Sequence, residues 1–407
     1  MKVAVLAIGN EVLCGKVVDT NGAFISREID LIGGRVTYKG SVQDTLDDIM
    51  LGLRQAYEHA DVVITIGGLG PTVDDLTREA VAKFFDEELL YSEEVFQEIS
   101  GHFFRMNLEV PDSNKQQAYY FKTGSVLKNG KGTAPGLSLK KDGKVVFLLP
   151  GPPHELQKMF KESVLPVVTE MIDEPIVMRS YRLLGIGESP AEAKVVHLYE
   201  KYPKLTIAPY CMPAIIDYMV KTSQHNEAEL DLFEKEFLAI LGEYHVGSTD
   251  VDLNVRVVEL LQEKKLTLAT AESCTGGMLA STFIDVPGVS SLFIEGVVAY
   301  GNEAKINRIG VDKELIAKHG AVSEEVARDM AVKLQKLTKA DVTISTTGIA
   351  GPNGGTDEKP VGTVYMTICI GEEEQTWHYT FVGDRNRIRM RVVNQALYTL
   401  YRLLIKG

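Results

Sequence analysis

The sequence predicts a multi-domain α/β protein whose N-terminal domain is a doubly wound sheet. Short β-branched runs alternate with amphipathic helical stretches up to about residue 170, and a second such series follows residue 250. This alternation is typical of βαβ units with a mainly parallel sheet. The chain has 407 residues, whereas one domain usually takes about 100–200. We therefore expect three domains, over 1–170, 171–250 and 251–407.

The first domain begins with Val3–Ile8, which like Asp61–Ile66 is apolar enough to be a strand buried on both faces. The stretches Asn21–Leu31, Thr45–Ala56 and Asp75–Phe85 carry apolar residues at helical spacing. Strands and helices in this order predict a doubly wound domain.

The second domain, 171–250, has a different pattern. Strand-like Val177–Leu184 and Ile215–Thr222 alternate with helix-like Ala191–Tyr199 and Glu227–Leu241. We interpret this β-α-β-α run as a small α+β domain.

The third domain, 251–407, begins with a helix that Asp250 opens at about Val251, and it continues as an α/β series. The expected strands are Leu266–Ala271, Phe293–Ala299, Val342–Thr346 and a hairpin near 361–371 and 375–382. The expected helices are Gly277–Ile284, Glu324–Leu337 and Asn386–Leu404.

Composition narrows the possible functions. A net charge of −13 disfavours direct binding to nucleic acid or to an anionic membrane, because both need basic surface. No segment reaches the ~18 apolar residues of a membrane span, and the N-terminus becomes polar too early for a signal peptide. The four cysteines form no C-x-x-C pair, so we expect reduced thiols and a cytoplasmic protein.

A glycine-rich turn follows the strand that ends at Ile66. Gly67, Gly68 and Gly70, followed by Pro71 and Thr72, let the backbone approach a ligand, and free N–H groups at a helix start favour phosphate. In the simpler interpretation the segment is a tight strand-to-helix turn in which Thr72 or Asp74 caps the helix.

Carboxylates are expected near the same edge of the sheet. Asn10-Glu11 follow the first strand, and Asp19 and Asn21 lie where the next helix begins. Each carboxylate alone would be a cap residue. Together beside a phosphate site they predict a divalent cation with oxygen ligands, held by Glu11, Asp19, Asp74 and Asp75.

Several motifs carry a family resemblance. The segments are Ala4–Leu13, Gly67–Asp75, Gly132–Gly136 and Leu149–Glu155. They resemble the molybdopterin-binding-type domain of the competence/damage-inducible protein A (CinA) family. The resemblance implies an ADP-ribose pyrophosphatase that needs Mg²⁺, Mn²⁺ or Co²⁺. It also implies ADP-ribose contacts at Gly67, Gly68, Gly70, Pro71, Thr72, Asn21 and Gly151, whereas Asn10 stands where the family usually has Asp.

Two other patterns do not match their motifs. Gly124–Gly132 has the wrong spacing for a P-loop, and Gly185-Ile186-Gly187 lacks the third glycine of a dinucleotide fingerprint.

The richest motif lies in the third domain, where Ala271-Glu272-Ser273 is followed by Cys274-Thr275-Gly276-Gly277. A strand ends and a helix begins here, so Ser273 is accessible as a nucleophile and N–H groups near Thr275–Gly277 are candidates for an oxyanion hole. Ser273 could equally be a helix cap, and Cys274 is a rival nucleophile.

The base must come from elsewhere in the chain. Tyr300 and Lys305 follow another predicted strand, and a lysine desolvated in a cleft can lose its proton and act as a base. Without Ser273, Lys305 would be read as a solvated surface residue.

A third loop, Thr346–Gly355, also follows a strand, and Lys359–Val364 comes soon after it. Backbone donors in such a loop suit a ribose phosphate. Arg385 lies in a run with Arg387, Arg389 and Arg391, and at a helix start it could reach a substrate phosphate.

These segments, together with Gly320–Glu324 and Gly383–Arg385, resemble the CinA C-terminal domain. The resemblance covers about residues 253–405 and implies a cofactor-free nicotinamide mononucleotide deamidase, with Ser273, Lys305, Tyr300 and Thr275 as catalytic residues. Its implied substrate contacts are Gly276, Gly277, Asn302, Thr347, Gly348, Ile349, Gly351, Gly362, Thr363 and Arg385.

Two interpretations follow. In the first, the chain is a bifunctional enzyme of pyridine-nucleotide salvage, and the family implies a homodimer whose ligands are nicotinamide mononucleotide and ADP-ribose. In the second, it is a non-catalytic pterin- or nucleotide-binding protein, or a partner protein in competence or DNA damage. Asn10 favours the second and the intact Ser273–Gly277 and Tyr300–Lys305 segments favour the first.

Overall fold

The computed structural model describes residues 1–213, 215–249 and 251–406. The chain divides into two compact units, Met1–Val177 and Met178–Gly407. The second unit contains two sheets, so the predicted 251–407 region and all but the first seven residues of the predicted 171–250 region lie within one compact unit. Asp250, expected to open a helix, lies outside the described residues.

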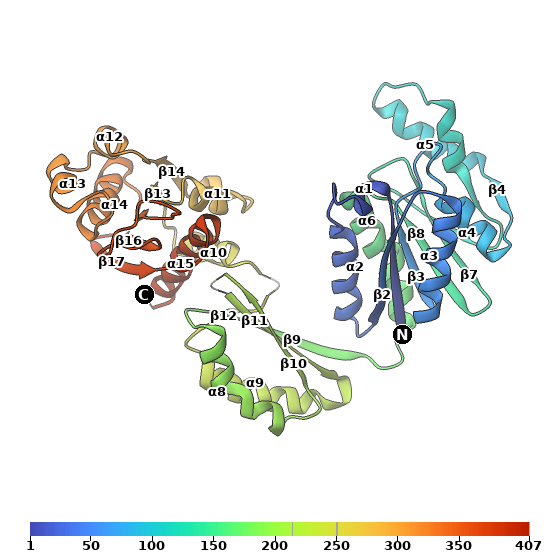
Figure 1. The fold of residues 1–407 in the computed structure, drawn as a ribbon, viewed down its shortest axis with the longest axis horizontal. Helices are drawn as coiled ribbons and strands as arrows, with labels where there is room; N and C mark the ends of the chain where they lie inside the picture. The colour runs from blue at the N-terminus through green and yellow to red at the C-terminus, as the bar shows by residue number, and fades with distance from the viewer. Residues whose placement is uncertain (214, 250, 407) are drawn as a thin grey trace. The chain divides into compact units, whose positions relative to one another are not determined.

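The first unit is built on a six-stranded sheet of order β2-β1-β3-β8-β7-β6 (Figure 1). The strands β2, β1, β3 and β8 are parallel, and β7 and β6 continue the sheet as antiparallel strands. Their bounds are β1 (Lys2–Ile8), β2 (Arg35–Val42), β3 (Val62–Ile66), β6 (Ser125–Leu127), β7 (Gly136–Lys141) and β8 (Lys144–Leu149).

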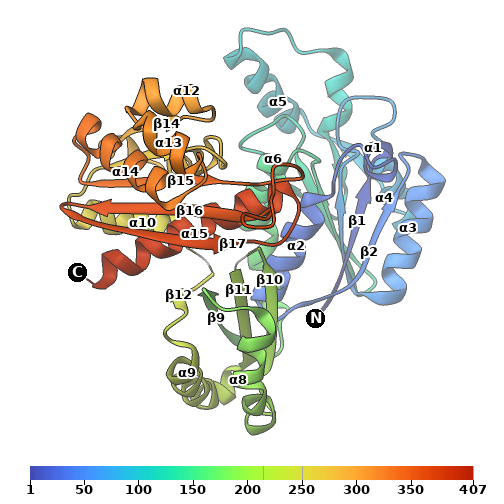
Figure 2. The same ribbon diagram turned by 60° about the vertical axis from the view of Figure 1, so that its left-hand side comes forward.

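Helices cover both faces of this sheet, as the doubly wound prediction requires (Figure 2). On one face lie α3 (Leu46–His59) and α4 (Thr77–Phe85), and on the other lie α2 (Thr20–Leu31), α6 (Pro153–Met159) and α7 (Leu165–Glu170). The remaining elements are α1 (Asn10–Leu13), β4 (Leu89–Tyr91), α5 (Glu93–Arg105), η1 (Asp112–Ala118), β5 (Tyr119–Phe121) and η2 (Phe160–Val164).

The helix after the glycine-rich turn begins later than predicted, at Thr77 instead of Asp75. Neither Thr72 nor Asp74 caps it, because its cap position is Leu76 with no side-chain cap. The Asp75 carboxylate instead accepts hydrogen bonds from the N–H and the hydroxyl of Thr72. The loop between β3 and α4 is therefore two residues longer than predicted.

The second unit begins with a four-stranded sheet of order β10-β11-β9-β12. Its elements are β9 (Ile176–Leu184), α8 (Glu188–Lys201), β10 (Thr206–Met212), β11 (Ile215–Ser223), η3 (Gln224–Asn226), α9 (Glu227–Leu241) and β12 (His245–Gly247). The β-α-β-β-α-β order is that of a ferredoxin-like module. The sequence prediction missed β10 and β12. Strand β10 lies at the sheet edge and is largely exposed, so it lacks the alternating pattern of a half-buried strand.

The rest of the second unit is a five-stranded sheet of order β14-β13-β15-β16-β17, in which β14, β13 and β15 are parallel. Its strands are β13 (Leu268–Glu272), β14 (Phe293–Val298), β15 (Val342–Gly348), β16 (Thr363–Ile370) and β17 (Glu373–Thr380). Its helices are α10 (Leu253–Glu263), α11 (Met278–Ile284), η4 (Val289–Ser291), α12 (Asn302–Ala304), η5 (Lys305–Ile309), α13 (Lys313–His319), α14 (Glu324–Thr338) and α15 (Arg385–Lys406).

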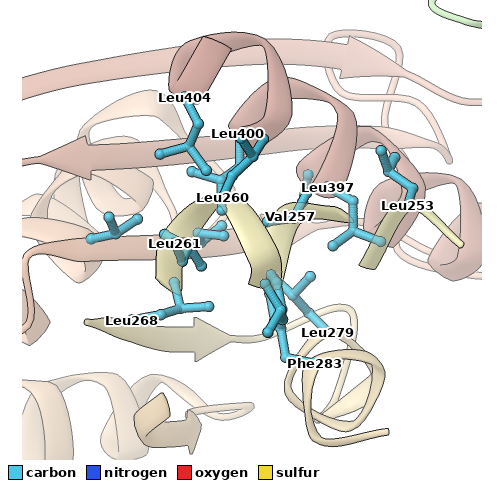
Figure 3. Close-up of a cluster of buried hydrophobic side chains, with 14 of the residues drawn as sticks. Leu253, Val257, Leu260, Leu261, Leu268, Leu279, Phe283, Leu397, Leu400 and Leu404 are labelled. Carbon is cyan, nitrogen blue, oxygen red and sulfur yellow. The ribbon is translucent and has the colours of Figure 1, made fainter. Parts of the chain in front are cut away.

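The core of this sheet is leucine-rich on the face covered by α10, α11 and α15 (Figure 3). Leu261, Leu279 and Leu400 are fully buried there, and burying each such side chain stabilises the fold by about 1.5–3 kcal/mol. The same cluster includes Leu184 of β9 and Val246 of β12. The ferredoxin-like module therefore shares a core with the five-stranded sheet.

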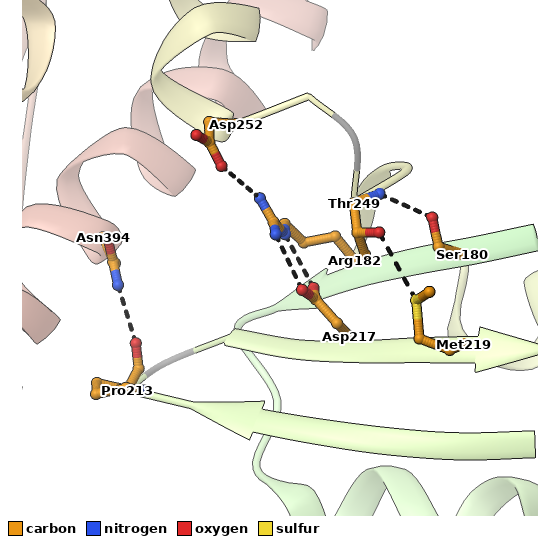
Figure 4. A network of polar contacts seen from close by, with 8 residues as sticks. All are labelled: Ser180, Arg182, Pro213, Asp217, Met219, Thr249, Asp252 and Asn394. Atoms are coloured by element: carbon orange, nitrogen blue, oxygen red, sulfur yellow. Dashed lines mark hydrogen bonds and ion pairs between the residues drawn. The ribbon is translucent and has the colours of Figure 1, made fainter. Parts of the chain in front are cut away.

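A buried ion pair reinforces this junction (Figure 4). The Arg182 guanidinium donates two hydrogen bonds of 2.9 Å to the Asp217 carboxylate, and a third to Asp252 just before α10. The Asn394 amide of α15 donates to the carbonyl of Pro213. Removing one partner of such a buried pair is costly because it leaves a buried charge unpaired.

Candidate active site

The predicted nucleophile lies at the carboxyl end of β13, where the chain makes a sharp turn into α11. The Ser273 N–H donates to the carbonyl of Thr346 at 2.9 Å, which ties the turn to the neighbouring strand β15. Gly276 and Gly277 follow with φ of +59° and +90°, a backbone conformation that side chains disfavour. The two glycines thus allow the turn that presents Ser273.

Lys305 meets Ser273 at this turn. Its Nζ lies 3.0 Å from the Ser273 Oγ and also bonds the carbonyls of Ala299 and Tyr300 at 2.9 and 3.0 Å. The sheet register produces the pairing, because the Ala299 N–H donates to the carbonyl of Glu272 at 2.8 Å. Residues at the ends of β13 and β14 are therefore side by side.

Burial controls the charge of this lysine. Lys305 is 1% exposed, and desolvation lowers the pKa of its amino group. No carboxylate pairs with it in the part of the chain that the structure describes. A neutral amine has two N–H donors, enough for the two carbonyls, and its lone pair is then left for the Ser273 hydroxyl.

The rival thiol lies in a less reactive environment. Cys274 is 5% exposed, and burial raises the pKa of its thiol to about 12, with the nearby Glu272 carboxylate acting in the same direction. A thiol is nucleophilic only as the thiolate. The environment therefore favours the serine over the cysteine.

The Glu272 carboxylate organises the start of α11. It is 1% exposed and accepts hydrogen bonds from the N–H groups of Gly277, Leu279 and Ala280 at 3.0, 3.0 and 2.8 Å. Among the predicted oxyanion donors, the Gly277 N–H is thus already used. The N–H groups of Thr275 and Gly276 are not among the donors to this carboxylate.

Thr275 is itself held on both sides. Its hydroxyl shares a 2.8 Å hydrogen bond with that of Thr346, and its carbonyl accepts one of 2.7 Å from Arg389. The sequence placed Arg389 in an arginine run without a role of its own, and it gave Glu272 no role either. For Glu272 the only signal in the sequence was its position directly before Ser273. For Arg389 it was the helical spacing of four residues from Arg385.

The third loop joins the site through Arg385. This guanidinium donates to the carbonyl of Gly351 at 2.7 Å and to the Tyr300 hydroxyl at 2.9 Å. Tyr300 and Arg385 are both exposed, so their polar groups remain accessible to a ligand. The contact brings together the segments around residues 300, 351 and 385, each of which holds a predicted site residue.

The other predicted substrate contacts differ in exposure and in whether their polar groups already have hydrogen-bond partners. The Thr347 hydroxyl is already bonded to the carbonyl of Ala321. Ile349 exchanges backbone hydrogen bonds with Thr363 and Gly362, which fixes the base of the loop beside Gly348. The Thr363 hydroxyl is buried without a partner in the described structure. Asn302 is exposed at the first turn of α12.

In the first unit, the glycine-rich turn borders a cavity of about 350 Å³. Its lining includes the predicted residues Gly67, Gly68, Gly70, Pro71, Gly151, Glu11, Asp74 and Asp75. Gly67 and Gly68 have φ of +95° and +68°, and a Cβ at Gly67 would lie 2.5 Å from the carbonyl oxygen of Ile8. Thr72 and Asn21 are not in the lining, but the Asn21 amide donates to the carbonyl of Gly151 at 2.7 Å.

Acidic side chains gather at this cavity, and two of them, Asp44 and Glu155, were not among the predicted site residues. Asp44 lines it, and burial raises the pKa of its carboxyl, with Glu11, Asp74 and Asp75 adding repulsion. Asp19 does not line the cavity, because its carboxylate caps α2 at Gly22. Over the described residues, no three of these groups are close enough to hold a metal ion together.

Comparison with known proteins fits both halves of this description. A profile of the CinA C-terminal domain matches residues 250–404, and one described as "Probable molybdopterin binding domain" matches residues 4–170. A competence-damage inducible protein of Clostridium beijerinckii is 40% identical over 410 residues, with 100% of both chains covered. The chain belongs to the CinA family. A second relative of this description, from Clostridium perfringens, is 42% identical over 411 residues, again with full coverage of both chains.

Solved structures match parts of this CinA family chain. A CinA superfamily protein of Klebsiella pneumoniae is 35% identical and covers 38% of this chain and 97% of its own, with a TM-score of 0.37. CinA of Thermoplasma acidophilum is 33% identical and covers 42% of this chain and 99% of its own, with a TM-score of 0.38. Among the described residues, no helix is long and apolar enough to cross a membrane.

Proposed function

We propose that the chain hydrolyses the carboxamide of nicotinamide mononucleotide to nicotinate mononucleotide and ammonia at Ser273. The observation that carries the proposal is the 3.0 Å approach of the buried Lys305 amine to the Ser273 hydroxyl. A serine beside a lysine with a lowered pKa is an activated nucleophile, and amide hydrolysis needs one.

The reaction divides into two steps. Ser273 Oγ attacks the carboxamide carbon while its proton passes to the Lys305 amine. The lysine then returns that proton to the leaving nitrogen, ammonia departs, and an ester to Ser273 remains. Water, deprotonated by Lys305 in the same way, attacks the ester and releases the acid product and the serine hydroxyl.

The negative charge that develops on the carboxamide oxygen during the attack must be stabilised by hydrogen-bond donors. The N–H groups of Thr275 and Gly276 are our candidates, and one such donor is worth roughly 2.7–4 kcal/mol where it has been measured. The Glu272 carboxylate and Arg389 hold the turn from either side. Donors fixed in this way need not reorganise as the charge develops.

Arg385 supports the choice of a nucleotide as substrate. Its exposed guanidinium is anchored by Tyr300 and by the glycine-rich loop at Gly351. A guanidinium placed in this way suits a phosphate monoester. We propose that it binds the 5′-phosphate and that the loop backbone at Gly348–Gly351 faces the ribose.

For the first unit we propose metal-dependent cleavage of ADP-ribose to AMP and ribose 5-phosphate. Gly67, Gly68 and Gly70 would face the diphosphate, and Asn21 would keep the Gly151 segment in place. Mutual repulsion among Asp44, Glu11 and Asp74 fits a site that gains a cation. A divalent cation typically combines one or two carboxylates with substrate phosphate oxygens, whose charge it neutralises.

Product analysis tests both proposals. Purified full-length protein is incubated separately with nicotinamide mononucleotide, with and without chelator, and with ADP-ribose plus Mg²⁺, Mn²⁺ or Co²⁺. We expect ammonia in the first case regardless of chelator, and AMP in the second only with metal. Binding of both nucleotides without any product would instead support a non-catalytic nucleotide-binding protein.

A further inference from the structure

The second unit contains a cavity whose lining does not include the Ser273 turn. It has a volume of about 820 Å³ and separates the ferredoxin-like module from helix α15 and strand β17. Its lining includes two features that the proposed reaction leaves unused. These are the Gly185-Ile186-Gly187 segment and the arginines Arg387 and Arg391.

The two arginines belong to the α15 face that borders the cavity. Arg387, Arg391 and Gln395 are four residues apart, so they lie along one side of the helix. Arg385 and Arg389 are each two residues away from these positions and so lie on another side of the helix. Their guanidinium groups contact Gly351 and Thr275 at the proposed deamidase site. The arginine run therefore divides between two sites.

In the described part of the chain neither guanidinium of the two cavity arginines forms an ion pair with a carboxylate, although the Asp384 carboxylate accepts a 2.9 Å hydrogen bond from the Arg387 backbone N–H. Arg391 donates to the carbonyl of Val382 at 2.6 Å, but its Nε is buried and has no acceptor. Glu188 is the one acid in the lining, and it lies beside the Cys211 thiol, whose pKa is raised by burial and by Glu188. The cavity is thus net positive in a chain whose net charge is −13.

The opposite wall adds further donors. Gly187 is the cap position of the 14-residue helix α8, and no side chain caps this end. Free N–H groups and the helix dipole favour an anion there. Gly185 has φ of +83°, and a Cβ would come within 2.8 Å of the Tyr398 ring, so the turn needs glycine to pass this close to α15.

Aromatic side chains complete the lining. Tyr379 and Phe381 of the β17 end stack on each other at 5.4 Å, and Tyr398 faces them from α15. Flat rings beside cationic groups are suited to a ligand with a planar ring and a phosphate.

We propose that this cavity binds a small organic phosphate carrying a planar ring. Its phosphate lies between Arg387, Arg391 and the start of α8, and its ring packs against Tyr379, Phe381 and Tyr398. The cavity lining contains none of the residues assigned to the two proposed catalytic sites, so the proposal does not depend on either activity.

The test is a titration of the full-length protein with AMP, with adenosine as the uncharged control. Binding is followed by the emission of Trp377, the chain's single tryptophan, which is on β17 two residues from Tyr379 and therefore reports on this cavity and not on the first unit. We expect a saturable change with AMP that adenosine does not produce. Arg387→Ala/Arg391→Ala should weaken it at least about tenfold, because hydrogen bonds to charged groups are involved.

Three variants locate the binding. Lys201→Ala/Lys204→Ala removes two charges elsewhere in the same module and should bind AMP normally, as should Arg385→Ala at the deamidase site. Arg391→Lys keeps the charge and should fall between wild type and the double variant. Unchanged thermal unfolding and ammonia release in the double variant would show that it is folded. AMP binding that is equal in the double variant, matched by adenosine, or absent in the wild type would overturn the proposal.

Discussion

The amino nitrogen of Lys305 lies 3.0 Å from the hydroxyl oxygen of Ser273, although 32 residues separate them in the chain. Parallel strands β13 and β14 end at the same edge of the sheet, and each residue follows one of these strands. The sheet topology therefore brings the two side chains together. Burial then lowers the pKa of Lys305, which lets its amine act as a base. The predictions below test the consequences.

The first prediction concerns pH. Burial lowers the pKa of Lys305, and only the neutral amine can take the Ser273 proton. Ammonia release should therefore rise with pH through this lowered pKa and fall on the acidic side as the lysine gains its proton. Lys305→Arg, which stays charged, should lose at least about 100-fold in kcat, the lower end of the range of general-base contributions. Steady-state rates over pH check this, and a flat profile for the wild type would contradict it.

The second prediction concerns Glu272 as a positioning residue. Glu272→Gln keeps the shape but places an amide nitrogen against N–H donors, which should lower stability by about 1–3 kcal/mol. Since these bonds hold the turn that carries the oxyanion donors, kcat should fall while KM changes little. Asp341→Asn is the matched control, because this carboxylate binds Thr267 at the opposite edge of the same sheet. Equal loss of kcat in both variants would point to stability alone.

Sequence alone predicted the pairing of Ser273 with Lys305 because periodicity reveals strands, and strand ends reveal the edge where side chains meet. It could not show that Lys305 is buried, because a lysine that follows Gly301-Asn302-Glu303-Ala304 is expected to be exposed to solvent. It also missed the cap made by Glu272, which depends on the turn folding back on its own strand.

In the first unit the glycine-rich turn was found, but the acidic set was predicted only in part. Asp19 and Asp75 make local bonds to Gly22 and Thr72, which the pattern of acidic residues could not separate from ligand contacts. Asp44 follows β2, which was not among the predicted strands. Its place beside the cavity became visible only through sheet order.

The third prediction concerns the substrate phosphate. Arg385→Ala removes the guanidinium that joins Tyr300 to the Gly351 loop. KM for nicotinamide mononucleotide should rise by at least about tenfold, from the loss of charged hydrogen bonds. Activity on nicotinamide riboside, which lacks the phosphate, should change little. A matching loss with the riboside would show that Arg385 organises the loop and does not bind phosphate.

The fourth prediction concerns the acidic cavity of the first unit. Asp44 has a raised pKa, so a cation that needs its carboxylate is lost at a higher pH than for an ordinary aspartate as the solution is acidified. Asp44→Asn should reduce ADP-ribose cleavage and raise the metal concentration needed for half-maximal rate. Asp19→Asn, at the α2 cap, should affect stability only. An unchanged metal dependence in Asp44→Asn would exclude this carboxylate from the site.

Trapping the acyl-enzyme is the most direct test of the central claim, that Ser273 attacks the carboxamide. Protein turning over nicotinamide mononucleotide is quenched in acid, digested and analysed by mass spectrometry. We predict an ester on Ser273 in the wild type and in Cys274→Ala, and none in Ser273→Ala, whose ammonia release should fall by at least about 1,000-fold. An adduct on Cys274, or wild-type ammonia release by Ser273→Ala, would contradict the serine mechanism.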